Sequence, residues 1–119
     1  MILVDTSVWI HHFRFSHGKL ITLLTNAEVT IHPFIIGELA CGNLHNRHEI
    51  LSLLHSLPSI EPLKNEDVLF FVEKNHLSGK GVGWVDVHLL ASSKLANIPI
   101  WTNDKKLGKV AEKLNLAYS

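Results

Sequence analysis

Short apolar segments alternate with longer amphipathic segments along this chain. Each short apolar segment is typical of a strand buried in a parallel sheet. We therefore predict strands at residues 2–5, 29–32 and 98–102. The longer segments repeat their apolar residues at helical spacing, and we predict helices at residues 6–14, 17–27, 33–42, 46–57, 65–77, 84–97 and 103–116.

Local signals mark several of these helix ends. Pro33 suits the first turn of a helix, and Gly42 stands where that helix should stop. Asn65 is placed to act as an N-cap for the helix that follows it. These signals support the boundaries drawn from the apolar pattern.

The alternation of strands with helices predicts a parallel sheet covered by helices on both faces. We therefore expect an α/β fold, a three-layer α/β/α domain with a short central parallel sheet. The chain has 119 residues, of which 46% are hydrophobic and 18% charged, and this composition is that of a globular chain. We expect residues 1–119 to form one domain around one core.

Charge and cysteine content narrow the function classes. Eleven basic residues balance eleven acidic ones, so no global charge points to nucleic acid or to a membrane surface. A net charge of zero predicts modest solubility for the chain alone, and therefore a partner or an oligomer. The single cysteine, Cys41, excludes an internal disulfide framework and a multi-cysteine zinc site. Because neither a signal peptide nor a long apolar span is present, we expect a cytoplasmic protein with no membrane partner.

Four of the acidic residues stand apart from the polar stretches that carry the others. Asp5 ends the first predicted strand and Asp104 follows the third. Asp86 lies near the start of the predicted helix 84–97, and Glu38 lies on the helix that follows the second strand. In a parallel sheet these places converge on one edge, where ligands bind. The pattern therefore predicts a functional site.

Carboxylates gathered at one edge repel one another. One pair about 4 Å apart costs on the order of 4 kcal/mol at an effective dielectric constant near 20. Protonation or a divalent cation relieves this cost, and an all-oxygen site favours Mg²⁺ or Mn²⁺ over zinc. Such a site does phosphoryl chemistry, and the substrate class that it implies is a phosphodiester. Taken singly, Asp86 and Asp104 are equally well explained as helix caps, and Glu38 as a paired core acid.

The motifs that carry these acids resemble, in order, the motifs of PIN-domain ribonucleases, and in particular those of the VapC toxins of bacterial toxin–antitoxin pairs. They read "ILVDTSVWI", "HPFIIGELACGNL", "GVGWVDVHLLASS" and "IWTNDKKL" and extend over essentially the whole chain. The resemblance implies an α/β/α fold and an endoribonuclease dependent on Mg²⁺ or Mn²⁺. It also implies inhibition by a small antitoxin, a homodimer, and a structured RNA substrate, often tRNA.

The resemblance also implies roles for individual residues. Asp5 and Asp86 would be direct metal ligands, while Glu38 and Asp104 would complete the catalytic site directly or through water. Thr6 and Thr102 would offer hydroxyl groups to a carboxylate or to a bound water. One departure is His11, which stands where relatives often carry an acid; the four acids are unaffected by it.

Basic and aromatic residues beside the acidic motifs are candidates for RNA contacts. Phosphate neutralisation requires cations near the site, and an exposed tryptophan can stack an unpaired base. Each of these residues taken singly is also explained as a solvated charge or a packed ring. The candidates are Arg14, Arg47, Lys80, Lys105, Lys106 and Trp84.

Other functions remain open at this point. A metal-independent ribonuclease would use two histidines as general acid and base, from pairs such as His11 with His12 or His45 with His48. An aspartyl phosphatase usually carries a second acid two residues after the first, where this chain has Ser7. A non-enzymatic module that binds ligands in an acidic pocket is the third alternative. None of these alternatives predicts RNA cleavage that depends on a divalent metal.

Overall fold

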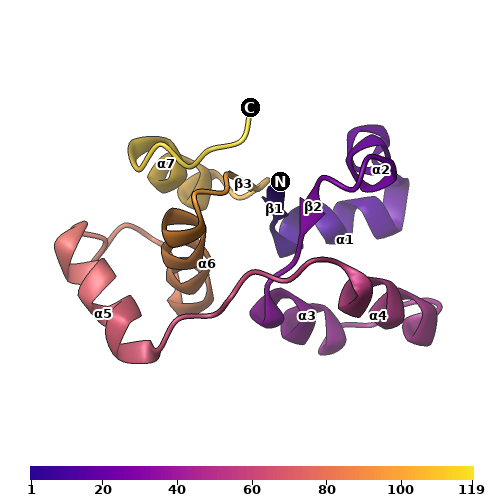
Figure 1. Cartoon of the computed structure of the whole chain (residues 1–119), viewed down its shortest axis with the longest axis horizontal. Coiled ribbons are helices and arrows are strands. Elements are labelled where there is room, and N and C mark those ends of the chain that lie inside the picture. The colour runs from indigo at the N-terminus through magenta and orange to yellow at the C-terminus, as the bar shows by residue number, and fades with distance from the viewer.

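The structure is a computed structural model that describes residues 1–119 (Figure 1). Strands and helices alternate along the chain as the apolar pattern predicts. The elements are β1 (Ile2–Val4), α1 (Thr6–Phe15), α2 (Gly18–Thr25), β2 (Val29–Thr30), α3 (Pro33–Ala40), α4 (Arg47–Ser56), α5 (Asn65–Lys74), α6 (Trp84–Ala96), β3 (Ile100–Trp101) and α7 (Lys105–Lys113).

The three strands form one parallel sheet in the order β2-β1-β3. Leu3 pairs with Thr30 on one side and with Ile100 on the other, so β1 is the central strand. Each strand is shorter than predicted: β1 lacks residue 5, β2 lacks residues 31 and 32, and β3 lacks residues 98, 99 and 102. The predicted α/β fold with a short central parallel sheet is confirmed.

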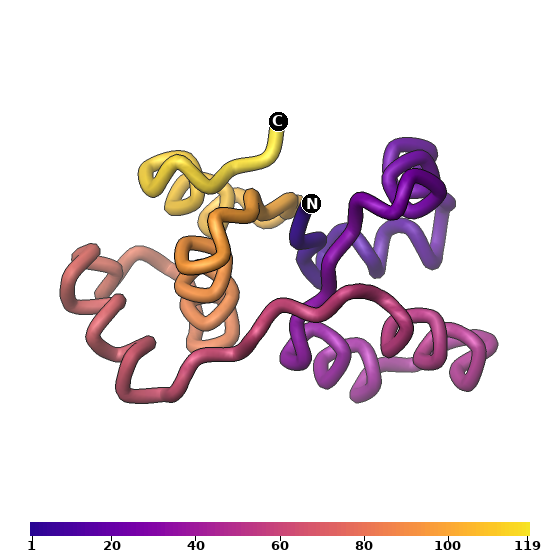
Figure 2. Tube along the Cα trace, in the orientation of Figure 1, coloured from indigo at the N-terminus to yellow at the C-terminus, as the bar shows by residue number.

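Helices lie on both sides of the strands. In Figure 1, α5, α6 and α7 lie on one side and α1 to α4 on the other, which makes the three layers. Figure 2 shows residues 57–64 crossing between the two groups of helices. There Ile31 donates its N–H to Pro58 and accepts from Ile60, at 2.9 and 2.8 Å, which ties the crossing segment to the end of β2.

The buried hydrophobic residues form one cluster that takes side chains from all three strands. Leu3 and Val4 of β1 are fully buried, and Val29 and Ile100 of the flanking strands are 1% exposed. Trp9 of α1 is the largest fully buried side chain. This cluster fixes the strands against both helical layers, so the residues at the carboxyl ends of the strands are held at one edge. No helix is long and apolar enough to span a membrane.

One predicted helix cap is wrong, although the helix itself starts at residue 65 as predicted. Pro33 is the first residue of α3, as expected, but the N-cap of α5 is Lys64 rather than Asn65. The Asn65 side chain is used elsewhere, because its Oδ1 lies 3.1 Å from Nε2 of His88, a fully buried residue of α6. A contact between two helices has therefore overridden a local capping preference.

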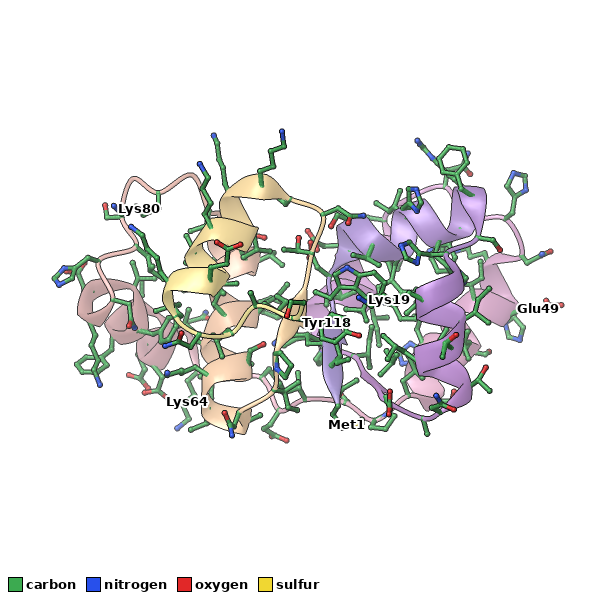
Figure 3. The ribbon with its side chains drawn as sticks, turned by 90° about the horizontal axis from the view of Figure 1, so that it is seen from above. Met1, Lys19, Glu49, Lys64, Lys80 and Tyr118 are labelled. Carbon is green, nitrogen blue, oxygen red and sulfur yellow. The ribbon has the colours of Figure 1, made fainter.

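The last helix is also shorter than predicted. The pattern extends it to residue 116, but α7 ends at Lys113 and the chain returns to the sheet. Ile100 donates to the Leu116 carbonyl at 2.7 Å and accepts from the Tyr118 N–H at 2.9 Å. The ammonium of Lys19 lies 4.6 Å from the centre of the Tyr118 ring, and both residues are labelled in Figure 3. The free edge of β3 is thus covered by the C-terminal segment.

Candidate active site at the carboxyl edge of the sheet

Asp5 is held in place by hydroxyl groups from both ends of the chain. It follows β1, caps α1, and is buried, with 6% of its surface exposed. Its Oδ2 accepts hydrogen bonds from Ser7 Oγ at 2.8 Å and from Thr102 Oγ1 at 2.7 Å. Its backbone N–H donates to the Trp101 carbonyl at 2.9 Å, which continues the pairing of β1 with β3. These bonds partly repay the cost of burying the carboxylate.

The same hydroxyl groups organise the turn that follows β3. Thr102 Oγ1 accepts from the backbone N–H of Asp104 at 3.0 Å, and Ser7 Oγ accepts from that of Asn103 at 3.0 Å. Each hydroxyl therefore accepts from this turn while it donates to Asp5. The hydroxyl groups of Ser7 and Thr102 thus link the turn that carries Asp104 to the Asp5 carboxylate.

The other three acids are each held by one nearby donor. Asp86 is the third residue of α6, and its Oδ2 accepts from the Gly83 N–H at 3.0 Å. Asp104 is the N-cap of α7, and its Oδ1 accepts from the Leu107 N–H at 3.0 Å. Glu38 is on α3, and its Oε1 accepts from Thr6 Oγ1 at 2.6 Å. Asp86 and Asp104 thus bond to helix N-termini and also belong to the acidic group.

Asp5, Glu38 and Asp104 lie close enough to Asp86 for their charges to act on its carboxyl group. Burial is the main cause that raises the pKa of Asp86, and the negative charges of Asp5, Asp104 and Glu38 raise it further. The hydrogen bond from Gly83 acts in the opposite direction. All the neighbouring charges that act on Asp86 are negative, so no positive charge offsets the charge of this carboxylate.

The oxygen atoms of this acidic group fit a divalent cation surrounded by water. In each carboxylate one oxygen accepts the bonds described above, which leaves Asp5 Oδ1, Glu38 Oε2, Asp86 Oδ1 and Asp104 Oδ2 without a protein donor. No three His, Cys, Asp or Glu side chains are gathered as a ready set of metal ligands. Mg²⁺ characteristically uses one or two carboxylates and keeps several waters. The donor set fits such an ion better than it fits zinc, which requires a compact set of side chains.

Replacing Asp86 by asparagine is expected to stabilise the metal-free protein at neutral pH. The folded state raises the pKa of this carboxyl, so the folded protein binds its proton more tightly than the unfolded chain does. The contribution of Asp86 to the unfolding free energy therefore falls as pH rises from 3.8 through the raised pKa of the folded state. Asparagine carries no charge and keeps an oxygen that can accept from Gly83, so the variant avoids this loss.

Urea unfolding in EDTA, at neutral pH and at about pH 4, measures the effect of Asp86→Asn. We expect the variant to be the more stable protein at neutral pH and its advantage to shrink near pH 4. The matched control is Asp67→Asn, which changes the exposed third residue of α5. If Asp86→Asn is less stable than wild type at neutral pH, the conclusion that uncompensated charge on Asp86 destabilises the folded protein is wrong.

The candidate RNA-binding residues lie in different places. Lys80 and Lys106 line one groove, and Arg14 lines a second groove together with Glu38. The Arg47 guanidinium donates to the carbonyls of Ala40 and Gly42, at 2.6 and 3.4 Å, so it secures the end of α3. Lys105 is exposed as the first residue of α7, and Trp84 is exposed at the start of α6, two residues before Asp86.

Sequence reasoning missed Ser7, which contacts both the acid and the turn. The available signal was a hydroxyl residue two positions after a helix-capping aspartate, in the first turn of α1. Its second contact, with the Asn103 N–H, joins positions 96 residues apart. That contact had no signal in the local pattern.

Comparisons with known proteins agree with the fold and the motifs. The family model described as PIN domain matches residues 2–113. Ribonuclease VapC32 of Mycobacterium tuberculosis is 43% identical over 108 residues, covering 90% of this chain and 87% of that protein, in each of two strains. Two solved structures share the fold. PAE2754 from Pyrobaculum aerophilum has a TM-score of 0.66 at 13% identity, and the match covers 96% of this chain and 94% of that one. FitAcB from Neisseria gonorrhoeae has a TM-score of 0.63 at 18% identity and covers 94% of both chains.

Proposed function

Because this chain belongs to the PIN domain family, we propose that it is a divalent-metal-dependent endoribonuclease and the toxin of a toxin–antitoxin pair. The observation that carries the proposal is the acidic group of Asp5, Glu38, Asp86 and Asp104. Each carboxylate has one oxygen that accepts no hydrogen bond from the protein. The identity with Ribonuclease VapC32 supports the choice of RNA as the substrate.

In this proposal Mg²⁺ or Mn²⁺ supplies a bound water of lowered pKa and stabilises charge on the cleaved phosphodiester. Asp5 and Asp86 would hold the ion directly, and Glu38 and Asp104 would complete the site directly or through water. Asp5 is the acid whose charge acts most strongly on Asp86, which supports this pairing. Thr102 and Ser7 fix one oxygen of Asp5 and leave the other for the ion, and Thr6 does the same for Glu38.

Residues around the acidic group would hold the RNA. Lys80, Lys105, Lys106 and Arg14 supply positive charge, and the exposed ring of Trp84 can stack an unpaired base two residues from Asp86. Arg47 is the weakest of these candidates because its guanidinium already binds two carbonyl groups. A structured cellular RNA such as tRNA, cut in a single-stranded region, is the proposed substrate, which places the reaction in the cytoplasm.

An antitoxin that inhibits this site would cover the acidic group. The groove that Glu38 shares with Arg14 has a volume of about 580 Å³ and includes apolar side chains such as Phe13 and Ile50. It suits an apolar segment that carries a basic side chain toward the acids. We propose that residues 1–119 act as one domain and assemble as a homodimer.

Cleavage of total tRNA by the purified protein tests the proposed nuclease activity. We expect cutting in Mg²⁺ or Mn²⁺, none in EDTA, and recovery when excess metal is returned. Cutting that persists in EDTA would favour the histidine mechanism. Absence of cutting in every condition, after any carried-over antitoxin has been removed, would leave a binding module with an acidic pocket.

A further inference from the structure

A groove of about 480 Å³ lies between α7 and the segment that follows α5. Four lysines and no acidic residue line it, although the chain as a whole has no net charge. Figure 3 shows Lys80 on the connection between α5 and α6, beside α7. The lining residues are Asn75, His76, Leu77, Lys80, Lys106, Lys109, Val110, Lys113 and Leu114.

Three of the lysines form a row along α7. Lys106, Lys109 and Lys113 are spaced by three and four residues, so they share one face of the helix. At 1.5 Å of rise per residue, the row is about 10 Å long. Lys80 comes from the connection between α5 and α6, while Leu77 and Val110 supply apolar surface.

The groove shares both of its walls with the acidic group. Asp104 caps the helix that carries the lysine row, so the row begins two residues from this acid. The Lys106 side chain lies against Gly81, where an added Cβ would meet its Cδ at 2.5 Å. Gly83, two residues further along, donates to Asp86. The end of the groove at Lys106 therefore lies near Asp104 and near the connection that leads to Asp86.

We propose that this lysine groove binds the phosphate backbone of the RNA next to the cleaved bond, with Lys109 and Lys113 as binding residues beyond Lys80 and Lys106. The inference rests on the proposed ribonuclease function and adds a path for the substrate. Positive charge repeated along a helix face matches a polymer that repeats its own negative charge at short intervals. The carboxylates of the acidic group repel the RNA phosphates. The lysines of the adjacent groove would offset this repulsion and retain the RNA.

The test is RNA binding as a function of salt, using Lys109→Gln with Lys113→Gln. Both lysines are exposed, and we expect the double variant to unfold at the wild-type temperature. Fluorescence anisotropy of a labelled single-stranded RNA, in EDTA, gives Kd between about 50 and 200 mM salt. Each phosphate contact on a single strand contributes about 0.7 to the slope of log Kd against log salt. The slope of the double variant should be smaller by about 1.4. The factor by which its Kd rises over this salt range should therefore be about 7-fold smaller than the factor for wild type.

The matched control is Lys64→Gln with Lys94→Gln, two exposed lysines outside the groove, and it should bind RNA as wild type does. An unchanged slope for the groove variant would overturn the proposal. So would unchanged RNA binding accompanied by lost binding of a polyglutamate peptide, which would assign the groove to an acidic protein.

The two proposals fail separately. If the protein cuts RNA with metal and the groove variant binds like wild type, the groove proposal falls and the ribonuclease stands. If the slope falls as expected but no condition gives cutting, the groove binds RNA and the proposed nuclease activity is wrong.

Discussion

Replacing Asp5 by asparagine is expected to reduce metal-dependent RNA cleavage by at least about 100-fold, because loss of groups that only support a metal ligand already costs 10- to 100-fold. The variant loses the negative charge at the centre of the hydroxyl network. Asparagine has the same shape, and its oxygen can still accept from Ser7 and Thr102. The fold should therefore survive while the affinity for the ion is lost.

The Asp5→Asn experiment compares initial cleavage rates over a range of Mg²⁺ concentrations, with circular dichroism to check folding. RNA binding in EDTA should be no weaker than in wild type, because the substitution removes a negative charge that repels phosphate and leaves the four lysines of the groove unchanged. Asp67→Asn, an exposed acid on α5, serves as the control and should cut at the wild-type rate. If folded Asp5→Asn protein cuts RNA as fast as wild type, the Asp5 carboxylate has no part in the mechanism.

Replacing Thr102 by valine is expected to lower cleavage by about 10- to 100-fold. Valine has nearly the same shape but neither donates to Asp5 Oδ2 nor accepts from the Asp104 N–H, which are both bonds of the threonine hydroxyl. Two of the four acids would lose their shared support in one substitution. The defect should appear mainly as a higher metal requirement, because the ligands themselves are retained.

Rescue separates this positioning role from a packing role. Thr102→Ser restores the hydroxyl without the methyl group and should recover most of the cleavage at low Mg²⁺. Thr25→Val is the matched control, since the Thr25 hydroxyl bonds only to the Ile21 carbonyl of its own helix. If Thr102→Val requires no more metal than wild type, the hydroxyl does not support the site.

The apolar pattern predicted the elements well because it reports on burial at each position. The three strands and seven helices occur in the predicted order, and Pro33 begins α3. Two departures from the local pattern, the cap of α5 and the end of α7, share one cause. Asn65 and the segment after Lys113 each gain a partner distant in sequence, His88 and Ile100, which outweighs the local preference.

The candidate site was predictable in part. The acids that follow β1 and β3 were expected at one edge because parallel strands end on the same side of their sheet. Two of them, Asp5 and Asp104, are joined through the Thr102 hydroxyl. The role of Arg47 at the end of α3 was not predictable, because its two carbonyl partners depend on how α3 and α4 meet.

The order of the elements, the parallel sheet and the edge where the acids lie were all predictable from the amino-acid sequence. These follow from the periodicity of the apolar residues and from the alternation of strands with helices, both of which can be read directly along the chain. Three features had to be seen in the folded chain: which oxygen of each acid accepts a hydrogen bond, the rise in the pKa of Asp86 through burial and like charges, and the four lysines that line one groove. Those features depend on distances between residues as far apart as Asp5 and Thr102, 97 positions along the chain, and such distances are set by packing.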